Sequence, residues 1–142
     1  MTKQQKLEVH FRITNIEFVG FEMSLPPDFR PLERYQYDID IESHIDHNNK
    51  LILVNLDIHI KNGKTKYGRL SSNYLYTIDN FDEVILKDKD QKYIVPTELQ
   101  TSLNSISIST ARGLMFSTLK GTALHNAILP VIDPKGFESN KL

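Results

Sequence analysis

The fold of this chain is decided by residues 51–63, which read LILVNLDIHIKNG. Every second residue of this stretch is a large aliphatic, and that period is typical of a strand with one buried face: Ile52, Val54, Leu56, Ile58 and Ile60. The pair Asn62-Gly63 favours a tight type I′ hairpin turn. We therefore expect another strand after it, in which the residues that share a face are Leu70, Tyr74, Tyr76 and Ile78.

Two more strands are expected upstream. The first strand alternates through Leu7, Val9, Phe11 and Ile13 and continues, with a bend or bulge, through Ile16 and Phe18. Three prolines then break residues 24–31 into a loop that is unusually apolar. The second strand covers Tyr35 to Glu42, has an acidic outer face of Asp38, Asp40 and Glu42, and is followed by a polar turn at 44–49. Four strands joined by short turns favour an antiparallel meander.

The segment from Thr97 to about Lys120 is predicted to be a long helix, which starts after Pro96 and ends before Gly121. Its apolar residues form two stripes, one of Leu99, Leu103, Ile106 and Leu114 and one, on roughly the opposite side, of Ile108, Ala111, Met115 and Leu119. Charge is confined to Glu98, Arg112 and Lys120. Either residues 123–132 fold over the second stripe, or a second subunit covers it. We expect the latter, a dimer or tetramer whose interface is Ile108, Ala111, Met115 and Leu119.

Composition excludes several classes of protein. The 142 residues suit one α+β domain, a four-stranded antiparallel sheet with the long helix on one face, and the net charge of -1 argues against a nucleic-acid partner. The chain has no cysteine, so disulfides and thiolate chemistry are absent. Since no apolar leader or membrane-spanning stretch is evident, we expect a cytoplasmic protein that does not insert into membranes.

No combination of residues predicts catalysis, a metal site or a cofactor. His44 and His47 lie in the predicted turn without a third ligand, and His10 and His59 alternate onto outward strand faces. His125 and Asp133 would form an acid/base pair only if a nucleophile lay beside them. Residues 82–92 are mixed in charge and are expected to be an exposed loop. The chain is thus not expected to be an enzyme; the nearest enzymatic alternative is a hot-dog-type thioesterase, in which the helix precedes most strands.

With this order of elements, the chain resembles the protein-export chaperone SecB. The resemblance rests on Ala111-Arg112, Lys120-Gly121-Thr122 and Ile128-Leu129-Pro130, together with Asn15-Ile16-Glu17-Phe18 and Leu75-Tyr76-Thr77-Ile78, and it extends from about Val9 to Pro134. It implies an ATP-independent holdase that assembles through its long helices and binds unfolded or partly folded chains in a groove between the crossover loop and the helix. The client-binding residues it implies are Phe21, Met23, Leu25, Phe29, Tyr35 and Phe116.

The departures from that family make service to the translocase motor SecA doubtful. The resemblance places Asn15, Val19, Tyr67 and Arg69 where SecB carries the acidic residues that dock SecA. Few residues follow Phe137, whereas SecB continues into a second helix and a tail. An adaptor that protects a single partner, such as an antitoxin, is therefore the alternative to a general holdase.

Overall fold

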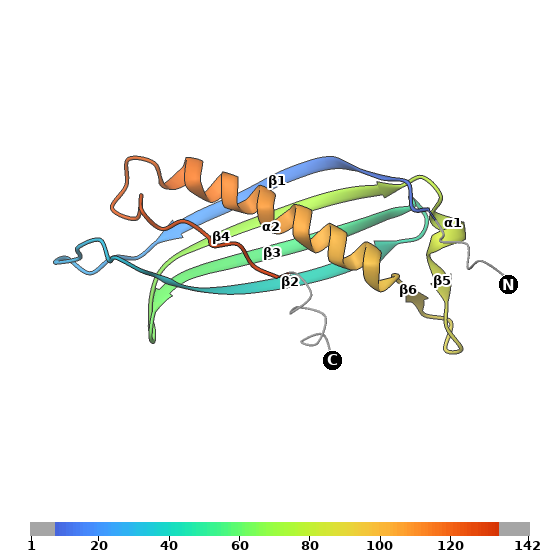
Figure 1. Ribbon diagram of the computed structural model, residues 1–142, viewed down its shortest axis with the longest axis horizontal. Helices are drawn as coiled ribbons and strands as arrows, with labels where there is room; N and C mark the ends of the chain where they lie inside the picture. Colours follow the sequence, from blue (N-terminus) through green and yellow to red (C-terminus); the bar gives the residue numbers. More distant parts are fainter. Residues whose placement is uncertain (1–7, 134–142) are drawn as a thin grey trace, which may run out of the picture.

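The structure is a computed structural model, which describes residues 8–133. It has a four-stranded antiparallel sheet in the order β1-β4-β3-β2, and one face of the sheet is covered by a long helix (Figure 1). The strands are β1 (Phe11–Met23), β2 (Gln36–Asp46), β3 (Leu51–Asn62) and β4 (Thr65–Ile78), and the helix is α2 (Thr97–Leu119). The predicted α+β architecture is confirmed, but the predicted meander is wrong: β1 pairs with β4 instead of β2, because the chain crosses from one edge of the sheet to the other between β1 and β2. Of the predicted first strand, Leu7 lies outside the described residues.

The strand boundaries differ from the sequence prediction at two turns. β2 continues to Asp46, so His44 belongs to the strand and the turn covers residues 47–50. The β3–β4 hairpin forms where Asn62-Gly63 predicted it, but its loop residues are Gly63 and Lys64. Among the described loop residues only Gly63 has a positive φ there, +61°, which is the pattern of a type II′ turn rather than type I′.

The predicted exposed loop at 82–92 holds for residues 88–92 but is wrong for residues 82–87, which contain regular structure. A single helical turn, α1 (Phe81–Val84), precedes a small hairpin of β5 (Leu86–Lys87) and β6 (Tyr93–Ile94). Aromatic rings hold this hairpin against the turn after β2. The rings of Tyr93 and His47 stack with their centroids 4.9 Å apart, and the ring centroids of Phe81 and Tyr93 are 6.3 Å apart. The apolar residues of this segment are few and widely spaced, so its sequence lacks the period of two that would predict a hairpin.

The core lies between the sheet and α2. The helix-facing rows of β3 and β4 are in register, with Ile52 opposite Tyr76 and Ile58 opposite Leu70, and all of them are buried. β1 has two register shifts, after Ile13 and after Phe18, so the expected bulge is confirmed. These bulges keep the apolar residues of a 13-residue edge strand on the helix side of the sheet.

α2 crosses the sheet obliquely, and residues 122–133 then return along it as an irregular segment (Figure 1). We call this segment the strap. Leu124, Ala127 and Leu129 of the strap are buried and belong to the same core as the sheet. The strap therefore covers one flank of α2, while the sheet on its other flank is left partly open.

Candidate functional site

The helix residues predicted as an oligomer interface are buried inside the protomer. Ile108, Ala111, Met115 and Leu119 have at most 2% of their surface exposed, because they face the sheet and the strap. Leu99 and Leu103 are buried on the same side of the helix. Apart from Ile106, which is 36% exposed, and Leu114, which is half-buried, the two stripes form one broad buried face within the protomer. These four residues need no second subunit to remove them from water.

The outward face of α2 nevertheless has one charged residue, Glu98 in its first turn, and none from Ser102 onward. Its exposed residues from Ser102 onward are Ser102, Ser105, Ile106, Ser109, Gly113, Phe116 and Ser117. Arg112, which lies beside this face, turns its guanidinium to the strap. A surface helix usually carries charged residues on its outer side, so this stripe is unusual for a face in contact with water.

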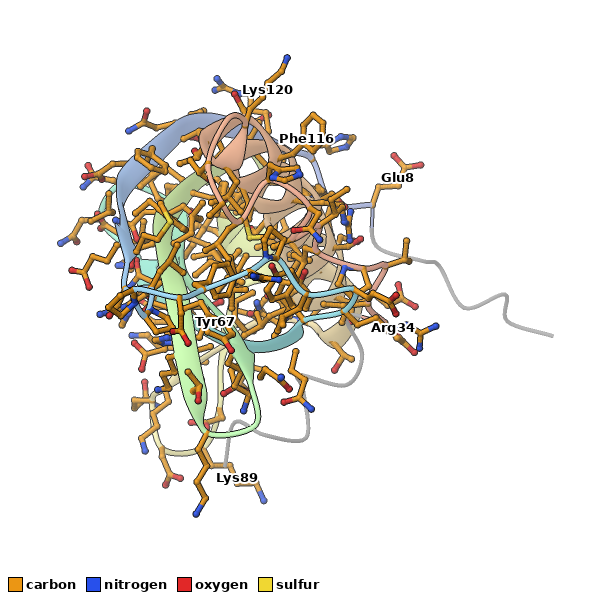
Figure 2. The ribbon with its side chains drawn as sticks, turned by 90° about the vertical axis from the view of Figure 1, so that its left-hand side faces the viewer. Glu8, Arg34, Tyr67, Lys89, Phe116 and Lys120 are labelled. Atoms are coloured by element: carbon orange, nitrogen blue, oxygen red, sulfur yellow. The ribbon has the colours of Figure 1, made fainter. Side chains whose placement is uncertain are left out.

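The crossover loop, residues 24–35, packs on the start of β4. The rings of Phe29 and Tyr35 lie 4.9 Å and 6.2 Å from the ring of Tyr67, which is itself buried. Tyr67 is labelled in Figure 2, which views the molecule from this end. Tyr67 is therefore not on the outer sheet face, where the SecB resemblance placed it. Leu25 is half-buried against the same core.

Phe21 closes the contact between the end of β1 and the strap. A Cβ at Gly68 would lie 2.9 Å from Phe21 Cζ and 3.3 Å from Leu124 Cδ1, so both side chains lie over this glycine. Met23, two residues later, has 42% of its surface exposed. The structure thus brings Phe21, Leu25, Phe29 and Tyr35 together beside the strap, with Met23 at the rim.

A polar clasp joins the crossover loop to the strap. The Asn126 amide nitrogen donates to the carbonyl oxygen of Leu32 at 2.6 Å, and the Tyr35 hydroxyl donates to Asn126 Oδ1 at 3.3 Å. The Leu32 N–H in turn donates to the Tyr35 hydroxyl at 3.0 Å. The clasp holds the position of Tyr35, and Asn126 was not among the predicted site residues.

On the helix side the strap is held by Arg112. Its Nε donates to the Leu129 carbonyl oxygen at 2.8 Å, and Nη2 donates to the Pro130 carbonyl oxygen at 2.9 Å. Phe116 is one helical turn further and is 52% exposed (Figure 2). Ile128 and Val131, which flank the two held residues, are also exposed. An apolar rim thus follows the strap.

A second exposed apolar row lies on β1, on the same face of the sheet that α2 covers. Ile13, Ile16 and Phe18 are 38%, 46% and 45% exposed. They stand opposite the buried β4 residues Tyr76, Tyr74 and Ser72, so they belong to the inner face. Because α2 crosses the sheet obliquely, this corner of the inner face is left uncovered (Figure 1).

The contact between α2 and the sheet contains buried polar groups. The hydroxyls of Tyr76 and Ser107 are 2.7 Å apart, and Gln100 Nε2 donates to both Ser43 and Asn104 Oδ1 at 2.8 Å. Burial raises the pKa of Tyr76 to about 12. Asn104 Nδ2 is buried, and among the described residues it has no hydrogen-bond acceptor.

The outer face of the sheet carries both signs of charge. Asp38 pairs with Lys61 at 2.8 Å, and Arg69 pairs with Asp57 at 3.2 Å. The hydrogen bond from Lys61 lowers the pKa of Asp38. The predicted acidic patch of β2 is therefore neutralised in part by Lys61 of β3.

The residues weighed for catalysis are scattered. His44 lies 3.5 Å from Glu42, His47 stacks on Tyr93, and His125 Nδ1 is 2.9 Å from the carbonyl oxygen of Thr122. In residues 8–133 no group of three or more His, Asp or Glu side chains has the geometry of a metal site. No helix of that part of the chain is long and apolar enough to cross a bilayer.

Comparisons with known proteins identify the fold. No protein-family model matches the chain, and no curated protein matches it in sequence. Among solved structures the chain is similar to the Mycobacterium tuberculosis Rv1957 SecB-like chaperone in complex with a ChAD peptide from the Rv1956 HigA1 antitoxin. The two are 14% identical, the match covers 86% of this chain and 89% of that chain, and the TM-score is 0.54. At this identity the likeness shows the fold, and the chain has a SecB-like α+β fold.

Proposed function

We propose that this protein is a cytoplasmic, ATP-independent holdase that binds unfolded or partly folded chains. One observation carries the proposal: large apolar side chains are exposed along both flanks of α2. They are Ile13, Ile16 and Phe18 on the β1 side and Phe116, Ile128 and Val131 on the strap side, with Met23 at the rim of the crossover loop. Contiguous exposed apolar patches mark interaction sites in soluble proteins.

Unfolded chains are the class of ligand that suits these surfaces. An unfolded segment has apolar side chains and free backbone groups at the same time, whereas a folded protein has buried most of both. β1 is an edge strand whose second side has no partner among the described residues, so it can pair with an extended backbone. Several weak apolar contacts made together give affinity with little dependence on sequence.

We further propose that the protein self-associates as a dimer or tetramer through the outward stripe of α2 from Ser102 to Gly113, which leaves Phe116 to the client surface. The stripe has no charge, and its serines and Gly113 permit close approach of another surface. A Cβ built at Gly113 meets nothing within 4 Å. This proposal takes the place of an interface at the buried residues Ile108, Ala111, Met115 and Leu119.

The aggregation of a slow-folding client tests the holdase proposal. We expect the protein to suppress aggregation at a near-stoichiometric ratio without ATP. Phe116→Ser should weaken the suppression, while Leu86→Ser should not, because Leu86 is equally exposed but lies on the β5–β6 hairpin. Equal loss in both variants would show that general surface hydrophobicity, rather than the surface beside α2, is responsible.

The alternative is an adaptor for one partner. It is favoured by the antitoxin peptide bound to the structural neighbour, which has the same fold. An adaptor would protect one protein and leave unrelated clients to aggregate, so the same assay with several clients separates the two functions. In either case we expect weak binding to SecA, because the outer sheet face is mixed in charge.

A further inference from the structure

The strap is bound to α2 as a protein binds an extended peptide. Arg112 donates to two consecutive backbone carbonyls, those of Leu129 and Pro130, at 2.8 Å and 2.9 Å. The planar guanidinium offers several donors in a fixed arrangement, so one side chain can engage two acceptors. Carbonyl groups are present in every polypeptide. This part of the contact therefore does not depend on which side chains the strap carries.

The apolar part of the contact has a simple pattern. Leu124, Ala127 and Leu129 face the core and are at most 1% exposed, while Ile128 and Val131 point away from it. Leu124 lies beside Phe21 over Gly68, and Asn126 is hydrogen-bonded to the crossover loop. The strap thus fills the space between the crossover loop and α2. That space is where the family resemblance implied a client groove.

We propose that the strap is a resident occupant of this channel and that a client segment displaces it. This inference rests on the proposed holdase function. Residues 127–133 form neither helix nor strand, so their release breaks no backbone ladder. The ligand class follows from residues 127–132 of the strap: an uncharged segment with a small residue, as at Ala127, and a large apolar residue two positions later, as at Leu129.

Displacement can be followed with a single buried thiol, because the chain has no cysteine of its own. In an Ala127→Cys variant the thiol is covered while the strap is bound, so it should react slowly with a thiol reagent. Saturating unfolded client should raise the rate on the order of tenfold, in parallel with client binding measured by fluorescence anisotropy. The matched control is Ala111→Cys, which is equally buried but lies on the inner side of α2 itself, and the labelling rate of its thiol should stay low. If Ala127→Cys does not fold, as judged by circular dichroism, Leu129→Cys replaces it.

The role of Arg112 is tested in the same background without any client. Arg112→Gln removes two charge-assisted hydrogen bonds, and a loss of that size should raise the basal labelling rate of the Ala127→Cys thiol on the order of tenfold. Arg12→Gln is the control, since Arg12 pairs with Asp79 on another part of the molecule. An unchanged rate in Arg112→Gln would overturn the assignment of Arg112 to the strap.

The outcomes separate the two proposals. A client that binds but leaves the Ala127→Cys thiol protected overturns the displacement of the strap and leaves the holdase function standing. Equal exposure of the Ala111→Cys and Ala127→Cys thiols also overturns it, because the whole helix would then have opened. Failure of every unfolded client to bind overturns the holdase function and, with it, this inference.

Discussion

The buried amide of Asn104 predicts that this fold can be made more stable by one substitution. Asn104 Nδ2 has no acceptor among the described residues, and a buried polar group left without a partner costs about 1–3 kcal/mol. Asn104→Leu removes that cost and keeps the branched shape of the side chain, but it also removes the acceptor of one hydrogen bond from Gln100, worth about 1 kcal/mol. Gln100 keeps its bond to Ser43. We expect a net gain of up to about 2 kcal/mol.

Urea denaturation measures this gain directly, as a higher midpoint with an unchanged slope. For a chain of this length a gain of about 2 kcal/mol corresponds to a rise in Tm of up to roughly 7 °C. Ser105→Leu is the control, because Ser105 is the next residue but is exposed, and its effect should stay within about 0.5 kcal/mol. A loss of stability in Asn104→Leu would mean that the amide has a partner in solution, and the reasoning would be refuted.

Three further predictions follow from the packing of the sheet and α2. Ile106→Glu should give a folded species of lower mass in light scattering, whereas Met115→Glu should unfold the protomer because Met115 is fully buried; an unchanged mass for Ile106→Glu would contradict the proposed interface. Gly68→Ala should lower the free energy of unfolding by about 1–3 kcal/mol, since a Cβ there meets a ring carbon at 2.9 Å, while Gly20→Ala, with open space around it, should not. The pKa of Tyr76 is raised from 10.0 to about 12, so its contribution to stability is complete below pH 10 and is lost as the pH rises through 12. The urea midpoint should therefore fall less steeply with pH in Tyr76→Phe than in the wild type over this range. Equal pH slopes of the midpoint in the two proteins would argue against the burial.

The sheet and the helix were predictable because their residues follow simple periods. β3 alternates over its full length, and its inward residues are all buried, as the period of two requires. The helix was predicted from Thr97 to about Lys120 and runs from Thr97 to Leu119. The small hairpin of β5 and β6 was missed because its strands have two residues each, which is too short for any period to appear.

The site was harder to predict because it depends on contacts between distant segments. Both apolar stripes of α2 had similar residues, and only the tertiary structure shows that they merge into one buried face with Ile106 left outside. Arg112 acts on the backbone of residues 17 and 18 positions away, and the sequence of the strap carries no signal for such a contact. The exposed row on β1 follows from the oblique path of α2, which periodicity does not determine.

The most direct test of the holdase account compares one client in two states. A fluorescent client is prepared in its native form and in a permanently unfolded form, and its binding to the protein is measured by anisotropy without nucleotide. The exposed apolar residues on both flanks of α2 suit a chain whose apolar side chains and backbone groups are not buried in its own fold. We therefore predict that the unfolded form of the client binds on the order of a hundredfold more tightly than the native form. Equal affinity for the two forms, or no binding of the unfolded form across several unrelated clients, would contradict the account.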